Sequence, residues 1–136
     1  MKAKSFLRKY ERARKRVEEI KRRLSDLEEQ STNVTQAMEA DRVQTSPQPD
    51  RIGRVVAMKI DLTAELVEAE TDALDMMNQI YVVLNQLEDP DHQRILRLRY
   101  IECLKWEDVA DQMHYESRNI FYIHGRALYE VEKIIN

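Results

Sequence analysis

The stretch that decides the fold is WEDVADQMHYESRNIFYI, residues 106–123. When Trp106 is counted as position 1, the small Ala110 falls at position 5, where two helices cross closely, and His114 falls at position 9, in the turn. Apolar side chains occupy positions 4, 8, 10, 15 and 18, which are Val109, Met113, Tyr115, Ile120 and Ile123. Two helices joined at a steep angle by a short turn need this combination. The spacing therefore predicts a helix-turn-helix, with His114 at a point where the backbone often needs a positive φ.

The flanking residues extend this unit into a small helical bundle. Asp89-Pro90-Asp91 predicts a helix start, because Asp caps the first turn and proline is favoured within it. The last helix carries apolar side chains on one side, namely Ile120, Ile123, Ala127, Leu128, Val131 and Ile134. Cys103 lies among apolar residues and is expected to be a buried thiol, and a single cysteine excludes an intramolecular disulfide.

Two heptad stripes precede the bundle. The first predicts a helix over about residues 3–30 and consists of Tyr10, Ala13, Val17, Ile20, Leu24 and Leu27. The second follows Asp50, a plausible N-cap, and settles into Leu62, Leu66, Ala69, Ala73, Met76, Ile80, Leu84 and Leu87. Residues 31–49 are polar, lack a sustained period and end in Ser-Pro-Gln-Pro, which predicts a flexible loop.

Charge is segregated along the chain. Residues 1–30 hold 11 Lys/Arg and 6 Asp/Glu, whereas residues 31–89 hold 4 and 11. An antiparallel coiled coil would bury both stripes and set opposite charges beside each other. The pairing could be within one chain or between chains. A salt-laced coiled coil accounts for the basic first helix better than a nucleic-acid-binding arm does.

The predicted fold is therefore all-α, with a long antiparallel coiled-coil hairpin over residues 1–88 and a helix-turn-helix domain over 89–136. No apolar run approaches the 18 residues of a membrane span, and no hydrophobic signal-peptide core follows the basic N-terminus, so a cytoplasmic protein is expected. The histidines share no metal-ligand spacing, and neither a phosphate-binding glycine loop nor a nucleophile motif is present. Neither an enzyme nor a bound cofactor or metal is expected.

Three segments resemble region four of bacterial sigma factors: residues 95–100 (ILRLRY), residues 106–110 (WEDVA) with Tyr115, and residues 123–128 (IHGRAL). The resemblance is closer to phage and prophage regulators of Gram-positive bacteria, of the autolysin-regulator-like and late-transcription-regulator-like kinds. It is specific over residues 87–135 and only architectural over 1–86. It implies a transcriptional regulator whose second helix enters the DNA major groove while neighbouring groups hold phosphates. In sigma factors this module also touches RNA polymerase.

The chain departs from this family at both helix starts. Lys105 and Glu116 stand where the family usually has Ser or Thr, and a lost cap costs about 1 kcal/mol unless Ser117 takes its place. Phe121 and Tyr122 stand where relatives often have basic residues on the outward face.

The candidate DNA-binding residues are Lys105, Ser117, Arg118, Asn119, Tyr122 and Arg126. Residues near the start of the second helix meet base edges in this motif class, and Arg can pair with guanine and Asn with adenine. Lys105 and Arg126 are candidates for phosphate contacts. The alternative is an ordinary solvated helix face. Gly125 is expected to allow a close approach, and packing of another helix is preferred over approach of the DNA backbone as the reason.

The leading hypothesis is a sequence-specific regulator of phage or prophage genes that binds double-stranded promoter or operator DNA. It would form a homodimer through the coiled coil and could engage RNA polymerase. The alternative is a non-enzymatic coiled-coil protein that binds RNA polymerase or another regulator without contacting DNA. The near-neutral charge of residues 90–136 and the aromatic residues Phe121 and Tyr122 motivate the alternative. Arg97 and Arg99 are expected to form structural pairs with acids among Glu102, Glu107 and Asp108.

Overall fold

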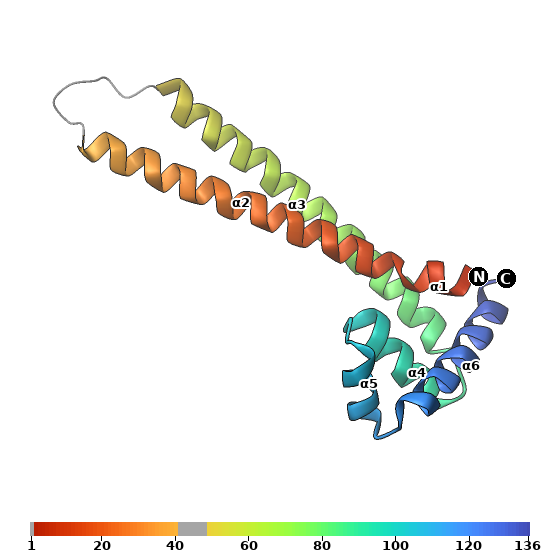
Figure 1. The fold of residues 1–136 in the computed structure, drawn as a ribbon. Helices are drawn as coiled ribbons and strands as arrows, with labels where there is room; N and C mark the ends of the chain where they lie inside the picture. Colours follow the sequence, from red (N-terminus) through yellow and green to blue (C-terminus); the bar gives the residue numbers. More distant parts are fainter. Residues whose placement is uncertain (1, 41–48) are drawn as a thin grey trace. The chain divides into compact units, whose positions relative to one another are not determined.

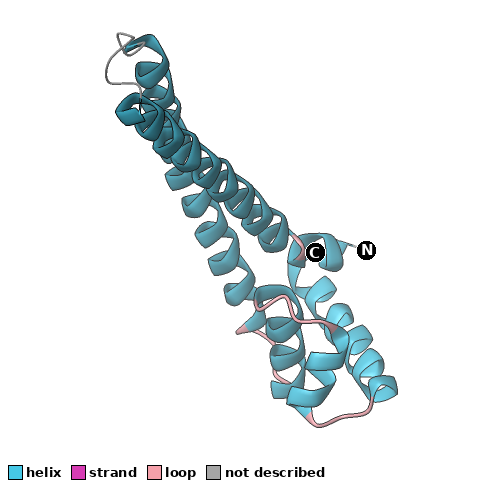
Figure 2. Cartoon of the chain, turned by 60° about the vertical axis from the view of Figure 1, so that its left-hand side comes forward, coloured by secondary structure: helices cyan, strands magenta, loops and turns pink. Residues whose placement is uncertain are grey.

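The computed structural model describes residues 2–40 and 49–136, with side chains over 2–32 and 50–136. All the regular structure in these described residues is helical, so the predicted all-α class is confirmed (Figures 1 and 2). The elements are α1 (Lys2–Leu7), α2 (Lys9–Ala40), α3 (Pro49–Leu84), α4 (Pro90–Leu96), the π-helix η1 (Arg97–Ile101), α5 (Trp106–Met113) and α6 (Ser117–Ile135). No helix among the described residues is long and apolar enough to cross a membrane.

The chain divides into two compact units. One unit comprises residues 1–14 and 72–136, and the other comprises residues 15–71. This division differs from the expected boundary between residues 88 and 89. The reason is that Leu7 of α1 and Ile80 and Leu84 of α3 are buried in one hydrophobic core with the C-terminal helices.

The unit of residues 15–71 is an antiparallel pair of helical segments from α2 and α3 (Figure 1). Its buried side chains come from the two predicted stripes and include Val17, Ile20, Leu27, Leu62 and Ala69. Oppositely charged side chains pair along the flanks: Lys59 Nζ lies 2.9 Å from Glu28 Oε1, and Arg23 Nη1 lies 3.9 Å from Glu65 Oε2. The Arg23–Glu65 pair is exposed, and in the other pair Lys59 is half-buried while Glu28 is exposed, so each pair contributes about 1 kcal/mol or less.

The predicted loop over residues 31–49 is wrong in its first part, because α2 continues to Ala40. Residues 31–40 (STNVTQAMEA) lack a heptad period, but they contain neither Gly nor Pro and include several good helix formers. A helix that is already nucleated extends through such residues without needing an apolar stripe. Pro49, the last residue of the predicted loop, instead begins α3, and residues 41–48 lie outside the described residues.

The other unit packs α1, α4, η1, α5 and α6 around one core, together with the end of α3. The first turn of α1 is held on α6, because the Ala3 backbone N–H donates to Glu132 Oε2 at 2.8 Å. Arg8 separates α1 from α2, so the predicted single helix over 3–30 is interrupted there.

The predicted start of α4 is confirmed. Asp89 has extended backbone angles, its side chain accepts from the Asp91 N–H at 2.9 Å, and Pro90 is the first helical residue. After η1 the chain reverses at Cys103, whose φ is 56°. The Cys103 side chain is half-buried rather than fully buried, because this reversal brings it toward the surface between η1 and α5.

Candidate nucleic-acid interface

The helix-turn-helix is formed by α5, a short turn and α6. His114 ends α5 in the left-handed region with φ 58° and ψ 37°, as the sequence predicted. The Tyr115 N–H then donates to the Ala110 carbonyl at 3.2 Å, which is the long-range bond of a Schellman motif. Val109 and Ile120 are fully buried where the two helices meet. This local hydrogen bonding fixes the direction in which α6 leaves the turn.

Tyr115 does not form the buried flank that its position in the spacing predicted. Its ring is 37% exposed, and its hydroxyl donates to Asp91 Oδ2 at 2.7 Å. The hydrogen bond from the hydroxyl and the charge of Asp91 raise the pKa of Tyr115. Tyr115 therefore ties the turn to the first turn of α4, because its polar end needs a partner that the core cannot offer.

Both helices of the unit begin without a side-chain cap. Lys105 precedes α5 and Glu116 precedes α6, each with extended backbone angles and no capping hydrogen bond from the side chain. Ser117 is the first residue of α6 and does not take over as cap. The backbone N–H groups of the first turn of α6 are therefore available at the surface.

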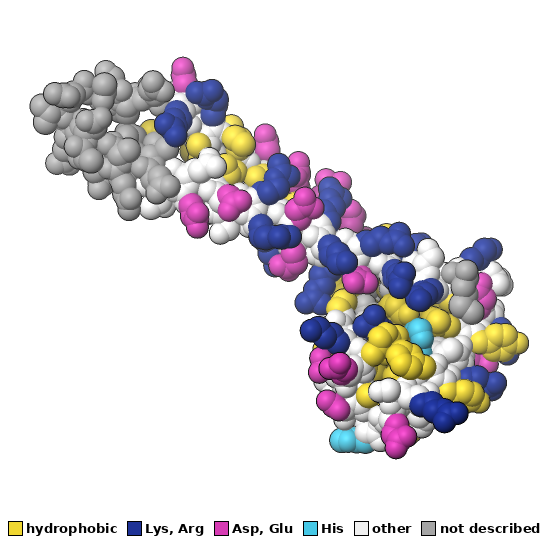
Figure 3. Space-filling view, in the orientation of Figure 1, with side chains coloured by type: hydrophobic (Ala, Val, Ile, Leu, Met, Phe, Trp, Pro, Cys, Tyr) yellow, Lys and Arg dark blue, Asp and Glu magenta, His cyan; other side chains and the backbone are white. Residues whose placement is uncertain are grey.

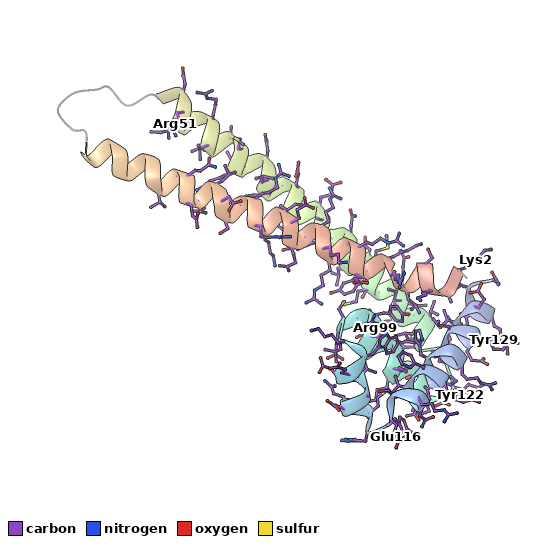
Figure 4. All side chains as sticks on the ribbon, viewed as in Figure 1. Lys2, Arg51, Arg99, Glu116, Tyr122 and Tyr129 are labelled. Carbon is purple, nitrogen blue, oxygen red and sulfur yellow. The ribbon has the colours of Figure 1, made fainter. Side chains whose placement is uncertain are left out.

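The outward face of α6 gathers five of the six predicted interface residues. Ser117, Arg118, Asn119, Tyr122 and Arg126 are all exposed. The opposite face of the same helix is buried in the core, with Ile120, Ala127 and Val131 at 0% exposure. Figure 4 shows Tyr122 projecting from the same side of α6 as Tyr129.

An open hollow of about 560 Å³ lies where the turn meets α6. It is lined by His114, Tyr115, Glu116, Arg118, Asn119 and Tyr122. The lining thus combines two phenol rings and an imidazole with a guanidinium, an amide and one carboxylate. Such groups can hydrogen-bond and stack on a base or a polar side chain, whereas Glu116 would repel a phosphate placed directly above it.

Lys105, the sixth predicted residue, lies at the start of α5 and is exposed. The ring of the next residue, Trp106, packs against α6. Its centroid is 5.3 Å from that of the Phe121 ring and 4.6 Å from that of the His124 ring. The Phe121 ring is 54% exposed, so an apolar surface lies between Lys105 and the outward face of α6.

A hydrogen-bonded aromatic pair beneath this surface was not predicted from the sequence. The Tyr100 hydroxyl lies 2.8 Å from His124 Nε2, and the two rings stack. Burial, with the nearby charges of Lys4 and Arg99, lowers the pKa of His124 to about 4. Burial also raises the pKa of Tyr100. Both side chains are therefore neutral at pH 7, and the histidine adds no charge to the surface above it.

The two arginines of η1 have different partners. Arg97 pairs with Glu102 at 2.6 Å, as predicted. Arg99 instead donates to the Leu104 carbonyl at 2.8 Å, and its guanidinium lies 4.5 Å from the centre of the Trp106 ring. The predicted acidic partner for Arg99 is wrong, because the left-handed turn at Cys103 brings a backbone carbonyl and Trp106 to it.

Gly125 does not serve helix packing, which was the preferred explanation from the sequence. A Cβ at Gly125 would meet no atom within 4 Å, so none of the described helices packs closely against it. Among the described residues, no group of three or more His, Cys, Asp or Glu side chains is placed to hold a metal ion.

A family model described as "Protein of unknown function (DUF1492)" matches residues 32–132. The match covers more than half of the chain and includes the helix-turn-helix with all six predicted interface residues. Neither the curated proteins nor the solved structures gave a match.

Proposed function

The chain belongs to the DUF1492 family, and we propose that it regulates transcription by binding a specific sequence in double-stranded DNA. The observation that carries the proposal is the outward face of α6, where Arg118, Asn119 and Tyr122 stand exposed beside the turn of a helix-turn-helix. In this motif class the second helix enters the major groove, and residues near its start contact bases. The resemblance to sigma-factor region four and to phage and prophage regulators supports the same function.

In this proposal each exposed group has a distinct role. Arg118 donates to a guanine, Asn119 pairs with an adenine, and Tyr122 packs against the base edges one turn later. Ser117, Lys105 and Arg126 contact phosphates on either side and set the position of α6 in the groove. The chain acts in the cytoplasm on phage or prophage promoters, and it has no catalytic role.

Selection of bound fragments from random DNA, at two salt concentrations, tests the proposal. We expect one sequence to be enriched and binding to weaken as salt rises. The double variant Arg118→Ala, Asn119→Ala should bind that sequence at least about 30-fold more weakly, because each good base contact contributes about 1–3 kcal/mol. A matched variant, Arg51→Ala with Asn78→Ala, removes the same residue types from exposed positions on α3 and should bind normally. Equal binding by both variants would refute the contact assignment.

The proposed regulator works as a homodimer. In the unit of residues 15–71, α3 exposes Val56, Ile60 and Val67 on one side, away from the stripe that packs on α2. A second copy of the chain could cover these side chains. Two linked helix-turn-helix units would then contact two half-sites, and this strengthens binding without new contacts in either unit.

A second candidate function is supported by the aromatic character of α6. Phe121, Tyr122 and Tyr129 are 54%, 65% and 54% exposed, and residues 90–136 hold 7 Lys/Arg against 8 Asp/Glu. Exposed aromatic rings on a nearly neutral helix are typical of protein interfaces. In this alternative the module docks on RNA polymerase without touching DNA. Binding of purified polymerase after nuclease treatment, together with no salt-dependent DNA binding, would favour it.

A further inference from the structure

The positive charge of the unit that holds the helix-turn-helix is concentrated in its N-terminal segment. Residues 72–136 hold 7 Lys/Arg and 12 Asp/Glu, so this part of the unit is acidic. Residues 2–14 hold 6 Lys/Arg and a single Asp/Glu. Neutralisation of phosphates by Lys and Arg supplies much of the free energy of DNA binding. The C-terminal helices alone are therefore poorly suited to hold a duplex.

The N-terminal segment is fixed to these helices. Ala3 and Leu7 lie one turn apart on α1, and both are fully buried in the core shared with α6. The hydrogen bond from the Ala3 N–H to Glu132 Oε2 adds a polar contact to α6. The buried side of α1 therefore holds the segment in place, while its basic side chains remain exposed. These are Lys2, Lys4, Arg8, Lys9, Arg12 and Arg14.

Some of these cations lie beside the aromatic surface between α5 and α6. After burial, the nearby charge of Lys4 contributes most to lowering the pKa of His124, and the charge of Arg8 partly offsets the rise that burial causes in the pKa of Tyr100. The charge of Arg99 lowers the pKa of both His124 and Tyr100, and its guanidinium lies over the Trp106 ring. Figure 3 shows Lys and Arg side chains of α1 and the start of α2 bordering a hydrophobic patch in which a histidine is visible. Arg99 and Lys2 are marked in Figure 4.

We propose that Lys4 and Arg8, with Arg99 and Lys105, form a row of phosphate contacts for the duplex that α6 enters. This inference rests on the proposed function and identifies the surface that holds the DNA backbone. The aromatic rings of Trp106 and Phe121 lie between this row and the bases contacted from α6. The DNA-binding unit is thus composite, because it combines residues from both ends of the chain.

This assignment separates the basic residues of the first two helices into two groups. Lys21 and Arg23 belong to the unit of residues 15–71, where they pair with Glu18 and Glu65. Lys4 and Arg8 belong to the other unit and accompany the helix-turn-helix. The coiled-coil explanation of the basic first helix therefore applies from residue 15 onward. In this proposal the basic residues before it contact phosphates.

Titration of DNA binding against salt tests the proposal on the full chain. Lys4→Ala with Arg8→Ala should weaken binding to the selected sequence and to unrelated duplexes by the same factor. It should also lower the slope of log affinity against log salt by about 2, because each phosphate contact contributes about 0.9. The conservative pair Lys4→Arg, Arg8→Lys should retain both affinity and slope. The control Lys21→Ala, Arg22→Ala removes as much charge from exposed positions of the other unit and should behave as wild type.

The outcomes distinguish this inference from the proposed function. If wild-type protein binds DNA specifically and Lys4→Ala, Arg8→Ala leaves affinity and slope unchanged, the phosphate row is wrong and the function stands. A changed sequence preference in that variant would also overturn the row, since phosphate contacts do not select bases. No salt-dependent DNA binding by wild type would refute the function and the row together. A further outcome is that wild type binds polyglutamate, and that Lys4→Ala, Arg8→Ala loses this binding while its DNA binding is unchanged. That result would assign the surface to an acidic protein partner and overturn the row. Unchanged thermal unfolding of the variant excludes misfolding as the cause.

Discussion

The Tyr100 hydroxyl and His124 Nε2 lie 2.8 Å apart and join η1 to α6 behind the outward face of the helix-turn-helix. Both rings are buried, and Trp106 packs edge-on against the histidine. Protonation of His124 would place a charge without a counter-ion in this buried setting, which is costly even though the protonated ring could still donate to the tyrosine oxygen. The pair therefore makes the orientation of α6 sensitive to acid.

His124 should make the unit of residues 1–14 and 72–136 less stable as the pH falls below 6.5. Its pKa is lowered from 6.5 to about 4 by folding, so the unfolded chain takes up the proton first. The stabilisation is complete above pH 6.5 and is lost as the pH falls toward 4. Between pH 7 and pH 5 the free energy of unfolding should fall by up to about 2 kcal/mol. Urea unfolding at the two pH values measures this.

A non-titrating side chain at this position isolates the effect. His124→Gln keeps a polar partner for Tyr100 but takes up no proton, so its stability should depend less on pH over the same interval. The variant is expected to be less stable than wild type at pH 7. An unchanged pH dependence in His124→Gln would show that other groups cause the acid sensitivity.

Gly125→Ala should stabilise the protein, because an added Cβ meets no atom within 4 Å and alanine is the better helix former. The expected gain is about 0.5–1 kcal/mol in the free energy of unfolding, measured by urea titration. If the duplex backbone approaches α6 closely, the same variant should bind DNA more weakly despite its higher stability. A loss of stability would contradict the open space around Gly125.

Glu116→Ser should strengthen the start of α6. A serine side chain at this position can accept from a backbone N–H of the first turn, and a good N-cap stabilises by about 1 kcal/mol. The change also removes a carboxylate from the hollow beside Arg118 and Asn119, so DNA affinity should rise. Glu116→Gln serves as the control, because it removes the charge without providing a short capping hydroxyl. Equal melting temperatures for the two variants would argue against capping.

The features that the sequence predicted correctly depend on local chemistry. His114 ends one helix and Asp89 caps the start of another, and local sequence predicts both because these side chains and their neighbours favour those backbone positions. The extension of α2 to Ala40 was missed for the opposite reason. The helix continues through residues 31–40 without any periodic apolar stripe, and such a stripe is the main indication of a helix in a sequence.

The missed features of the interface depend on tertiary contacts. Tyr100 and His124 are 24 residues apart, and no spacing rule connects a residue of η1 with one of α6. The hydrogen bond from the Ala3 N–H to Glu132 joins residues 129 positions apart, and no local sequence pattern predicts it either. The Tyr115 hydroxyl donates to the Asp91 carboxylate of α4, and this contact keeps the tyrosine ring at the surface. The spacing alone predicts that this ring is buried.

The exposed side of α3 should mediate self-association. Val56, Ile60 and Val67 are 4 and 7 residues apart, which is the spacing of a second heptad stripe, and Ile60 and Val67 are 64% and 60% exposed. Ile60→Glu with Val67→Glu places two carboxylates in this stripe, so sedimentation velocity should show monomers at concentrations where wild type is a dimer. Ser25→Glu with Gln30→Glu adds the same charge to exposed positions of α2 and should leave the dimer intact. Wild-type protein that sediments as a monomer at every concentration would exclude this interface, whatever the behaviour of the variants.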